Sequence, residues 1–492
     1  MLPYQTLILI DRNVHMPVYQ QVANRLVGLI QEGRIQPGAF LPGTRELAAL
    51  LQLHRKTVVA AYGELERQDW IRTIPRKGVL VSPDLPEVKP RTFRSGKGAE
   101  AYKGGTGFTY ARQPEQPTPL IATGGHHLVI NDGFPDVRES PVALLLRECR
   151  RLSQTRAYAH RLMYGRSSGT EHLREALARH LAASRGLSIG PENVLVTRGA
   201  QMSIYLAAAM LIRPGDKVIV GACNYRYADL CFEQLGATLV RVPVDEQGID
   251  VQAVAALCKR TRIRMLYVVP HHHHPTTVTL SAERRMQLLE LIRDHNLAVI
   301  EDDYDYDFHY ASGPILPLAS GDHGGNVLYT GSMTKSLALS IRVGFLVAPG
   351  GFIQETAHLR RLMDLRGDNL IEEALAALLD NGDIDRHLKK TNKLFKERRD
   401  VLCDLLTEHL SGVIEFKKPD GGMAVWARFP RKYSIPKLSA RAADLGLLIG
   451  DGSSYRTAES GDNGTRLGFA SLTTTEIREA IRLLKRAAAG TA

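Results

Sequence analysis

The stretch Gly331-Ser332-Met333-Thr334-Lys335-Ser336 decides how the larger part of this chain is interpreted. It lies between residues 327–330 and 341–347, two short apolar runs of the kind that form β-strands. A lysine in a turn between strands, with hydroxyl side chains beside it, suits an amine that attacks a carbonyl while the hydroxyls bind a phosphate. Taken alone, the stretch is equally compatible with an ordinary surface loop.

An acidic and tyrosine-rich sequence, Glu301-Asp302-Asp303-Tyr304-Asp305, follows an apolar run about thirty residues before Lys335. A carboxylate at the end of a buried strand can keep a pyridine nitrogen protonated, because a nearby negative charge favours the cation. A protonated pyridine is the electron sink of pyridoxal phosphate chemistry. A calcium loop or a solvated acidic face is the alternative, but the glycine and the ligand spacing of an EF-hand are missing.

With these residues, the segment from about Gly133 to Leu484 resembles a fold-type I pyridoxal-phosphate aminotransferase. The whole chain resembles the MocR/GabR-type transcriptional regulators, in which a GntR-family winged helix is fused to such a domain. The resemblance implies pyridoxal 5'-phosphate as cofactor, with Lys335 as the Schiff-base lysine and catalytic residue. It also implies Asp302 as the partner of the pyridine nitrogen and Tyr304 as the donor to the phenolate oxygen.

The phosphate of such a cofactor has its own candidates. The turn Gly199-Ala200-Gln201 opens an apolar helix, and the unpaired N–H groups of a helix start bind anions. Arg342 is expected to pair with the phosphate by both likeness and chemistry, helped by Ser332 and Thr334.

The resemblance adds three residues to the expected site. It implies that Tyr225 stacks on the pyridine ring and that Tyr164 reaches the phosphate across a dimer interface. It also implies that Arg466 binds the carboxylate of an effector. The implied assembly is a homodimer, arranged head-to-tail.

The amino-terminal residues predict a winged helix-turn-helix. Three helices are expected over about 18–32, 44–51 and 55–67, followed by a basic hairpin, and a three-helix interaction module is the alternative. His54 and Gly43 stand where small hydroxyl residues are usual, so both helix starts are expected to be weakly capped. The candidate DNA-binding residues are Arg45, Arg55, Lys56 and Thr57 on the helices and Arg76, Lys77 and Gly78 on the wing.

The expected fold class is α/β, with a large domain built on a mainly parallel sheet and a smaller carboxy-terminal α+β subdomain. We expect a winged helix at residues 1–82, a flexible linker rich in Pro, Gly and charge at 83–124, and an effector-binding and dimerisation domain at 125–492. The chain is 492 residues long, which is too long for one ordinary domain.

The run His271-His272-His273-His274-Pro275 raises the question of a metal. Consecutive side chains in an extended loop point to opposite sides, so one ion could not bind all four, and no metal site is expected. His272 or His274 is a candidate neighbour of the cofactor. Thr277 stands in place of the family's usual glycine, which leaves the shape of the effector pocket open.

Composition points to a cytoplasmic protein. The five cysteines are scattered, no apolar run approaches the roughly 18 residues that cross a bilayer, and no basic region with an apolar segment begins the chain. A net charge of +11 is compatible with nucleic-acid binding.

The resemblance therefore implies a regulator that binds paired half-sites on double-stranded DNA. It would sense a small amino compound through external aldimine formation. An active aminotransferase with an attached DNA-binding domain, or a sensor of the cofactor itself, remains the alternative.

Overall fold

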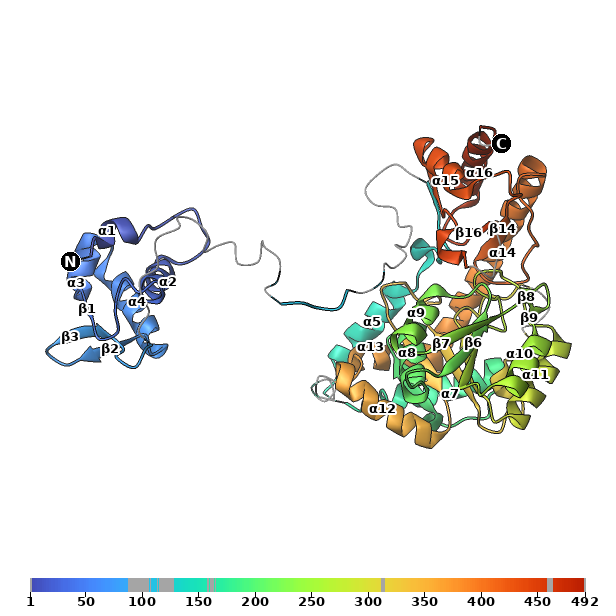
Figure 1. Ribbon diagram of the computed structural model, residues 1–492, viewed down its shortest axis with the longest axis horizontal. Helices are drawn as coiled ribbons and strands as arrows, with labels where there is room; N and C mark the ends of the chain where they lie inside the picture. The colour runs from blue at the N-terminus through green and yellow to red at the C-terminus, as the bar shows by residue number, and fades with distance from the viewer. Residues whose placement is uncertain are drawn as a thin grey trace. The chain divides into compact units, whose positions relative to one another are not determined.

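The structure, a computed structural model, describes residues 2–86, 106, 108–112, 114, 128–156, 159, 163, 165–310, 315–457 and 463–490. The chain divides into two compact units, Met1–Gln113 and Pro114–Ala492, whose elements are labelled in Figure 1. Most of the expected linker at 83–124 lies outside the described residues, so its flexibility stays a prediction. In the part of the chain that is described, no helix is both long and apolar enough to span a bilayer.

The first unit is a helical bundle with a small sheet. Its elements are α1 (Tyr4–Leu7), α2 (Val18–Gln31), β1 (Phe40–Leu41), α3 (Thr44–Leu50), α4 (Arg55–Arg67), β2 (Ile71–Ile74) and β3 (Gly78–Val81). The three strands pair antiparallel in the order β1-β3-β2. Leu26, Leu47, Val58 and Leu65 are buried in one cluster, because each lies on the inward face of its helix. The predicted three helices and hairpin are confirmed.

The start of α4 is better capped than the sequence suggested. Nδ1 of His54 accepts a hydrogen bond from the backbone N–H of Lys56 at 3.2 Å, as a capping hydroxyl oxygen would. The Glu46 carboxylate accepts the N–H of Gly43 at 3.3 Å. The expectation of a weak cap was therefore wrong for α4, whereas Gly43 offers no side-chain acceptor to the first turn of α3.

The second unit is built on a seven-stranded sheet in the order β5-β13-β12-β11-β10-β6-β7. Its strands are β5 (Val194–Thr197), β6 (Lys217–Gly221), β7 (Thr238–Val242), β10 (Met265–Val268), β11 (Ala298–Asp303), β12 (Val327–Ser332) and β13 (Gly344–Val347). Among these strands, β13 alone runs in the opposite direction to the others and pairs antiparallel with β12 and β5. The expected mainly parallel sheet is therefore confirmed. A short hairpin, β8 (Val244–Asp245) with β9 (Gly248–Ile249), lies outside the sheet.

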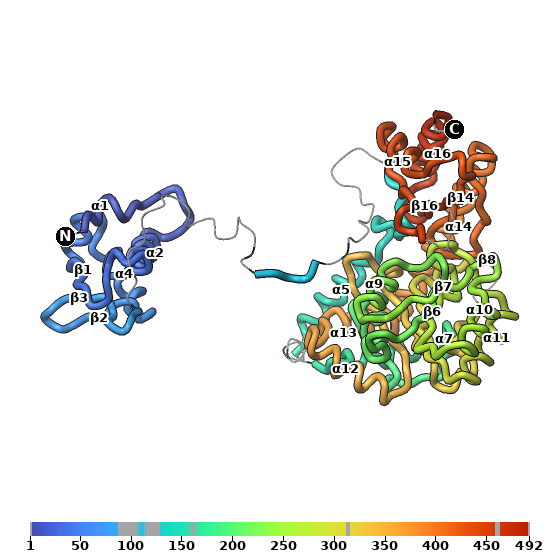
Figure 2. The backbone as a smooth tube through the Cα atoms, in the orientation of Figure 1, coloured from blue at the N-terminus to red at the C-terminus, as the bar shows by residue number. Residues whose placement is uncertain are grey.

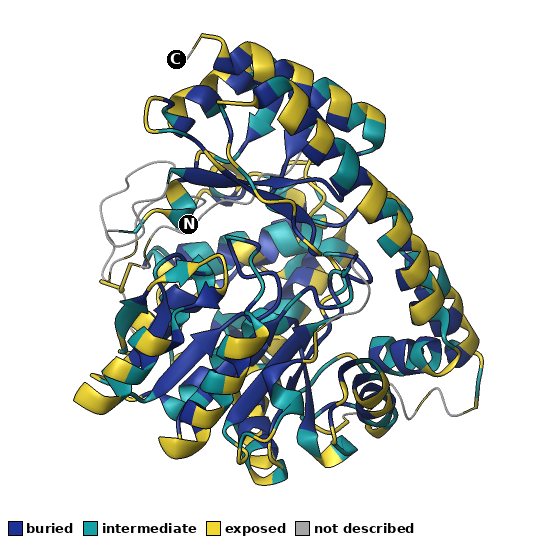
Figure 3. Ribbon diagram, turned by 90° about the vertical axis from the view of Figure 1, so that its right-hand side faces the viewer, coloured by how far each residue is buried: buried dark blue, intermediate teal, exposed yellow. Residues whose placement is uncertain are grey.

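Helices cover both faces of this sheet. They are α7 (Glu171–Arg185), α8 (Ala200–Leu211), α9 (Arg226–Gln234), α10 (Val251–Arg260), α11 (Ala282–Asp294), α12 (Gly350–Asp364) and α13 (Asn369–Asp380). Val218 and Val220 pack in a cluster with α8 and α9, whereas Ile219 between them packs in another with α10 and α11. Alternation along a strand thus gives each face its own core. In Figure 3 the strands are buried, and the helices around them are exposed on their outer sides.

The smaller subdomain combines distant parts of the chain. It contains α14 (Asp383–Leu410), β14 (Ala424–Arg428), α15 (Ile435–Asp444), β15 (Leu447–Ile449), β16 (Gly464–Gly468) and α16 (Thr474–Ala488). β14 pairs antiparallel with β16, while β15 pairs in parallel with β4 (Leu128–Ile130). The blue-green segment of β4 therefore lies among the red carboxy-terminal elements (Figure 2). α5 (Val142–Ser153) packs against α13.

Short 3₁₀ turns complete the unit, at Val137–Glu139, Pro191–Asn193, Leu318–Ser320 and Ser453–Tyr455.

Candidate cofactor and effector site

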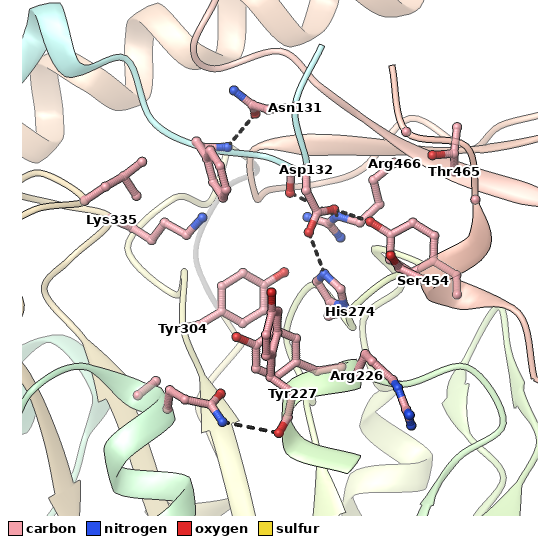
Figure 4. Close-up of a pocket in the computed structure, with 18 of the residues that line it drawn as sticks. Asn131, Asp132, Arg226, Tyr227, His274, Tyr304, Lys335, Ser454, Thr465 and Arg466 are labelled. Atoms are coloured by element: carbon pink, nitrogen blue, oxygen red, sulfur yellow. Dashed lines mark hydrogen bonds and ion pairs between the residues drawn. The ribbon is translucent and has the colours of Figure 1, made fainter. Parts of the chain in front are cut away.

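A cavity of about 680 Å³ opens at the carboxyl ends of the parallel strands, where ligands bind in open α/β sheets. Its walls come from the ends of β11 and β12, the start of α8, the loop after β4 and the loops around β15 and β16. The predicted residues on its walls are Ala200, Gln201, Tyr225, Asp302, Tyr304, Ser332, Thr334, Lys335, Arg342 and Arg466. Figure 4 shows several of their side chains directed into the cavity. Tyr164 lies outside the described residues.

Lys335 lies three residues past the end of β12. Its Nζ donates to the Gly133 carbonyl at 2.7 Å and lies 4.8 Å from the centre of the Phe134 ring. Burial lowers the pKa of Lys335 to about 8, because the charged ammonium loses its water. A part of the population therefore carries a neutral, nucleophilic amine near neutral pH.

Asp302 lies on β11, the strand beside β12. Its Oδ2 accepts the hydroxyl of Tyr267 at 2.7 Å, and Thr330 donates to Oδ1 at 3.4 Å. Burial raises the pKa of Asp302 to about 7 in the absence of a cationic partner. A buried carboxylate with a raised pKa would bind a protonated ring nitrogen strongly, because the cation would stabilise its ionised form.

The start of α8 and the loop after Lys335 form a cradle of donors. Nη1 of Arg342 donates to Thr334 Oγ1 at 3.3 Å, and the Thr334 N–H donates to Ser332 Oγ at 3.1 Å. Gly199 has a φ of 88°, and a Cβ at this position would meet Arg342 Nη2 at 2.5 Å. The cradle therefore requires a glycine, and an added methyl group would displace the guanidinium.

The two predicted tyrosines also line the cavity. The hydroxyl of Tyr304 donates to the backbone carbonyl of His272 at 3.1 Å. The ring of Tyr225 meets the ring of His274 edge-on, with centroids 5.2 Å apart. Both residues line the cavity, and their roles toward a cofactor remain predictions.

Sequence reasoning missed the surroundings of Arg466. Nε of this buried arginine lies 2.8 Å from Oδ1 of Asp132, whose other oxygen meets His274 Nε2 at 3.1 Å. Tyr455 donates its hydroxyl to Asp132 at 2.6 Å. Figure 4 shows Asp132 between Arg466 and His274. Asp132 directly precedes the expected entry segment at Gly133, and nothing in the local sequence indicated its partner.

The four histidines have separate surroundings. Their partners are Ile315 O and Asp303 for His271, Asp305 for His272, Thr276 for His273 and Asp132 for His274. Of the two candidate cofactor neighbours, His274 lines the cavity and His272 does not. Among the described residues, no three His, Cys, Asp or Glu side chains gather in a metal-binding arrangement.

The predicted DNA-binding residues lie on one helix pair and the wing of the first unit. Arg45, Arg55 and Lys56 are exposed, and Thr57 is half-buried. Nε of Arg55 lies 3.4 Å from Thr44 Oγ1, which joins the starts of α3 and α4. Arg76, Lys77 and Gly78 are exposed at the turn between β2 and β3.

Comparison with known proteins accounts for both units. Residues 142–484 match the family described as "Aminotransferase class I and II". The chain belongs to this family. Residues 18–81 match "Bacterial regulatory proteins, gntR family". The protein is therefore a fusion of a GntR-type DNA-binding unit with an aminotransferase-family unit, the MocR/GabR-type architecture.

Relatives share either the whole fusion or the larger unit. The probable rhizopine catabolism regulatory protein MocR of Rhizobium meliloti is 27% identical over 98% of this chain and 96% of its own length. The HTH-type transcriptional regulator TauR of Rhodobacter capsulatus is 28% identical over 93% and 94%. The α-aminoadipate aminotransferase LysN of Thermus thermophilus, solved with N-(5'-phosphopyridoxyl)-L-leucine, superposes with a TM-score of 0.69. It is 26% identical and covers 74% of this chain and 93% of its own.

Proposed function

We propose that this protein is a transcription regulator that binds pyridoxal 5'-phosphate in the cavity of its aminotransferase-family unit and responds there to a small amino compound. One observation carries the proposal. Lys335 and Asp302, at the ends of adjacent strands, line the same cavity in a chain that also has a GntR-type unit. We place the protein in the cytoplasm, where its DNA would be.

The residues of the cavity fit this cofactor. A Cβ at Gly199 would meet the Arg342 guanidinium, which supplies the charge that would pair with a phosphate. Asp302 supplies a buried carboxylate for the ring nitrogen, and Lys335 supplies a primary amine. When bound, pyridoxal phosphate contributes an aldehyde and an electron-withdrawing ring.

The chain's own residues would prepare the site for this chemistry. The lowered pKa of Lys335 keeps part of its amine deprotonated, and the Gly133 carbonyl orients it. Asp302 would hold a proton on the ring nitrogen, since the ion pair offsets the cost of burying its charge. Ser332 and Thr334 would orient the phosphate through their hydroxyl and N–H groups.

The loop at 131–134 offers a route from the cavity to the DNA-binding unit. It follows β4, the first described strand after the expected linker, and it supplies Asp132, Gly133 and Phe134 to the site. A ligand that binds beside Asp132 and Gly133 would change the position of this loop. We propose that this change alters how two winged helices bind paired half-sites on double-stranded DNA.

We further propose a homodimer. Leu362 and Met363 on α12 are 85% and 50% exposed, and Leu146 on α5 is 59% exposed. A partner subunit that covers these apolar side chains would lower their cost in water. The head-to-tail arrangement belongs to the same proposal.

Two measurements on the reconstituted protein test this function. DNA is first selected by the protein from a random-sequence library, and its affinity is measured by fluorescence anisotropy with and without amines. The proposal predicts that an amine which changes the cofactor's absorbance also changes DNA affinity, and that Lys335→Ala abolishes both effects. An amine that changes the absorbance but leaves the DNA affinity constant would contradict it.

A turnover enzyme is the second candidate, because Lys335, Asp302, Arg342 and Arg466 all line the cavity. Incubation with amino donors and a keto acid separates the two, since sustained multiple turnover would show an active aminotransferase. A sensor of the cofactor itself predicts a different result. Apo and reconstituted protein would then bind DNA differently without any amine.

A further inference from the structure

Asp132 sets the charge of the cavity wall opposite Lys335. Its carboxylate lies against the Arg466 guanidinium, with Nε 2.8 Å from Oδ1. The two residues are distant in sequence, since Asp132 follows β4 and Arg466 lies on β16. Arg466, the arginine expected to bind a ligand carboxylate, is therefore already paired with a carboxylate of the chain.

Two of the three guanidinium nitrogens of Arg466 are also engaged by backbone carbonyls. Its Nε donates to the Asp132 backbone carbonyl at 3.2 Å in addition to the side chain, and Nη1 donates to the Pro275 carbonyl at 3.1 Å. A carboxylate that binds side-on to Nε would require the bonds from Nε to Asp132 to break. The side chain of Arg466 is only 2% exposed, so it cannot rotate away into solvent to do so.

Asp132 is held in place by two further donors. Tyr455 donates its hydroxyl to Oδ1 at 2.6 Å, and His274 Nε2 meets Oδ2 at 3.1 Å. Burial raises the pKa of Asp132, but His274 and Arg466 outweigh it and keep the pKa below its usual range. The carboxylate is therefore ionised throughout the neutral range.

His274 does not restore a positive charge to this wall. Burial lowers the pKa of His274, and the attraction of Asp132 only partly opposes this effect. The imidazole is thus mainly neutral near pH 7. Its Nε2–H then donates to Asp132, while Nδ1 is buried with no hydrogen-bond partner in the described part of the chain.

The remaining charged groups on the walls do not change the balance. Asp302, Lys335 and Arg342 are the groups that we assign to the cofactor, which leaves Arg226 and Asp451 besides the Asp132–Arg466 pair. Arg226 lies 3.5 Å from Glu233. Among the described residues, the part of the cavity wall around Asp132 and Arg466 therefore has no uncompensated positive charge.

Asp132 can still accept a hydrogen bond from a ligand. Its side chain is 40% exposed, on the cavity wall. Oδ2 has His274 as its one partner among the described residues, and a carboxylate oxygen has two lone pairs. A ligand hydroxyl or ammonium group would fit this acceptor, whereas a ligand carboxylate would meet a like charge.

We propose that Asp132 is a specificity-determining residue: it neutralises Arg466 and selects primary amines that carry a hydroxyl or a second amine in place of a carboxylate. This inference rests on the proposed function and names its effector class, the amino alcohols and diamines. It differs from the expectation that Arg466 binds an effector carboxylate, because the carboxylate that pairs with Arg466 in this structure belongs to Asp132.

The test uses full-length protein reconstituted with pyridoxal phosphate and two matched ligand pairs. The first pair is 2-aminopropan-1-ol and alanine, and the second is 1,3-diaminopropane and 3-aminopropanoate. Affinities come from the change in cofactor absorbance and, independently, from calorimetry. The proteins are wild type, Asp132→Asn, Asp132→Ala and the control Asp451→Asn, which changes an acidic wall residue that does not pair with Arg466.

Wild type and Asp451→Asn are expected to bind the alcohol and the diamine at least tenfold tighter than the matched acids. Asp132→Asn and Asp132→Ala are expected to reverse this preference while retaining the cofactor's absorbance. A wild-type preference for the acids, or a ratio unchanged by both Asp132 variants, overturns the inference and leaves the proposed function standing. Failure of all four amines to act on cofactor-loaded wild type overturns both.

Discussion

Tyr267 donates its hydroxyl to Asp302 at 2.7 Å, so a neutral side chain on β10 holds the carboxylate that we assign to the ring nitrogen. A neutral donor orients the carboxylate without cancelling its charge. The charge thus stays available for a cationic ligand. Burial of this carboxylate raises the pKa of Asp302 to about 7.

Asp302→Asn tests this relationship. The folded-state pKa of Asp302 is raised, so the wild-type apoprotein binds an extra proton when folded and loses stability as pH rises from about 4 to about 7. The variant cannot lose stability in this way. Thermal unfolding should show that its free energy of unfolding, relative to that of wild type, increases between pH 5 and pH 8 by on the order of a few kcal/mol.

The same variant should bind pyridoxal phosphate about 10- to 100-fold more weakly, because a hydrogen bond to a charged group is worth about 1.5–3 kcal/mol. Equal cofactor affinity in equilibrium dialysis would mean that Asp302 does not meet the ring nitrogen.

Gly199→Ala should weaken cofactor binding by about tenfold or more, because the added Cβ would meet Arg342 Nη2 at 2.5 Å and displace it from the phosphate. Gly215→Ala is the matched control. Gly215 has a φ of 89°, close to the 88° of Gly199, but nothing lies within 4 Å of an added Cβ. Both variants should lose similar stability from backbone strain. If both also lose the same affinity, strain alone explains the effect.

The rate at which Lys335 captures pyridoxal phosphate should rise with pH and level off above about pH 8. The neutral amine is the nucleophile, and burial lowers the pKa at which it forms. Stopped-flow absorbance measures this rate. A rate that continues to rise toward the ordinary lysine pKa of about 10.4 would show that burial does not activate this amine.

Arg55→Ala should weaken specific DNA binding by about 1–3 kcal/mol, the worth of a good base contact, and leave cofactor binding unchanged. Arg55 is exposed at the first residue of α4, the end expected to enter the major groove. Arg67→Ala, at the last residue of the same helix, is the control and should lose little affinity. Equal losses in the two variants would point to general charge rather than to a base contact.

Much of this architecture is predictable from local patterns. The period of apolar residues predicted the bounds of α2 and α4 to within a residue or two. The two apolar runs on either side of Lys335 predicted its position after the end of β12. The acidic end of β11 likewise led to Asp302. In each case the signal lies within one element and its flanks.

The partners of these residues depend on tertiary contacts that no local pattern encodes. Asp132 meets Arg466 because the loop after β4 lies beside β16, where the Gly468 N–H donates to the Asn131 carbonyl. The sheet places β10 beside β11, which brings the hydroxyl of Tyr267 to Asp302. The Asp132–Arg466 ion pair is therefore a long-range contact that a local pattern does not predict.

Borohydride reduction of the protein reconstituted with pyridoxal phosphate, followed by peptide mapping by mass spectrometry, tests the central claim most directly. The account predicts a phosphopyridoxyl group on Lys335, visible absorbance before reduction, and neither in Lys335→Ala, while the exposed-lysine control Lys396→Ala behaves as wild type. A label on another lysine, or a colourless wild-type protein after reconstitution, would contradict it.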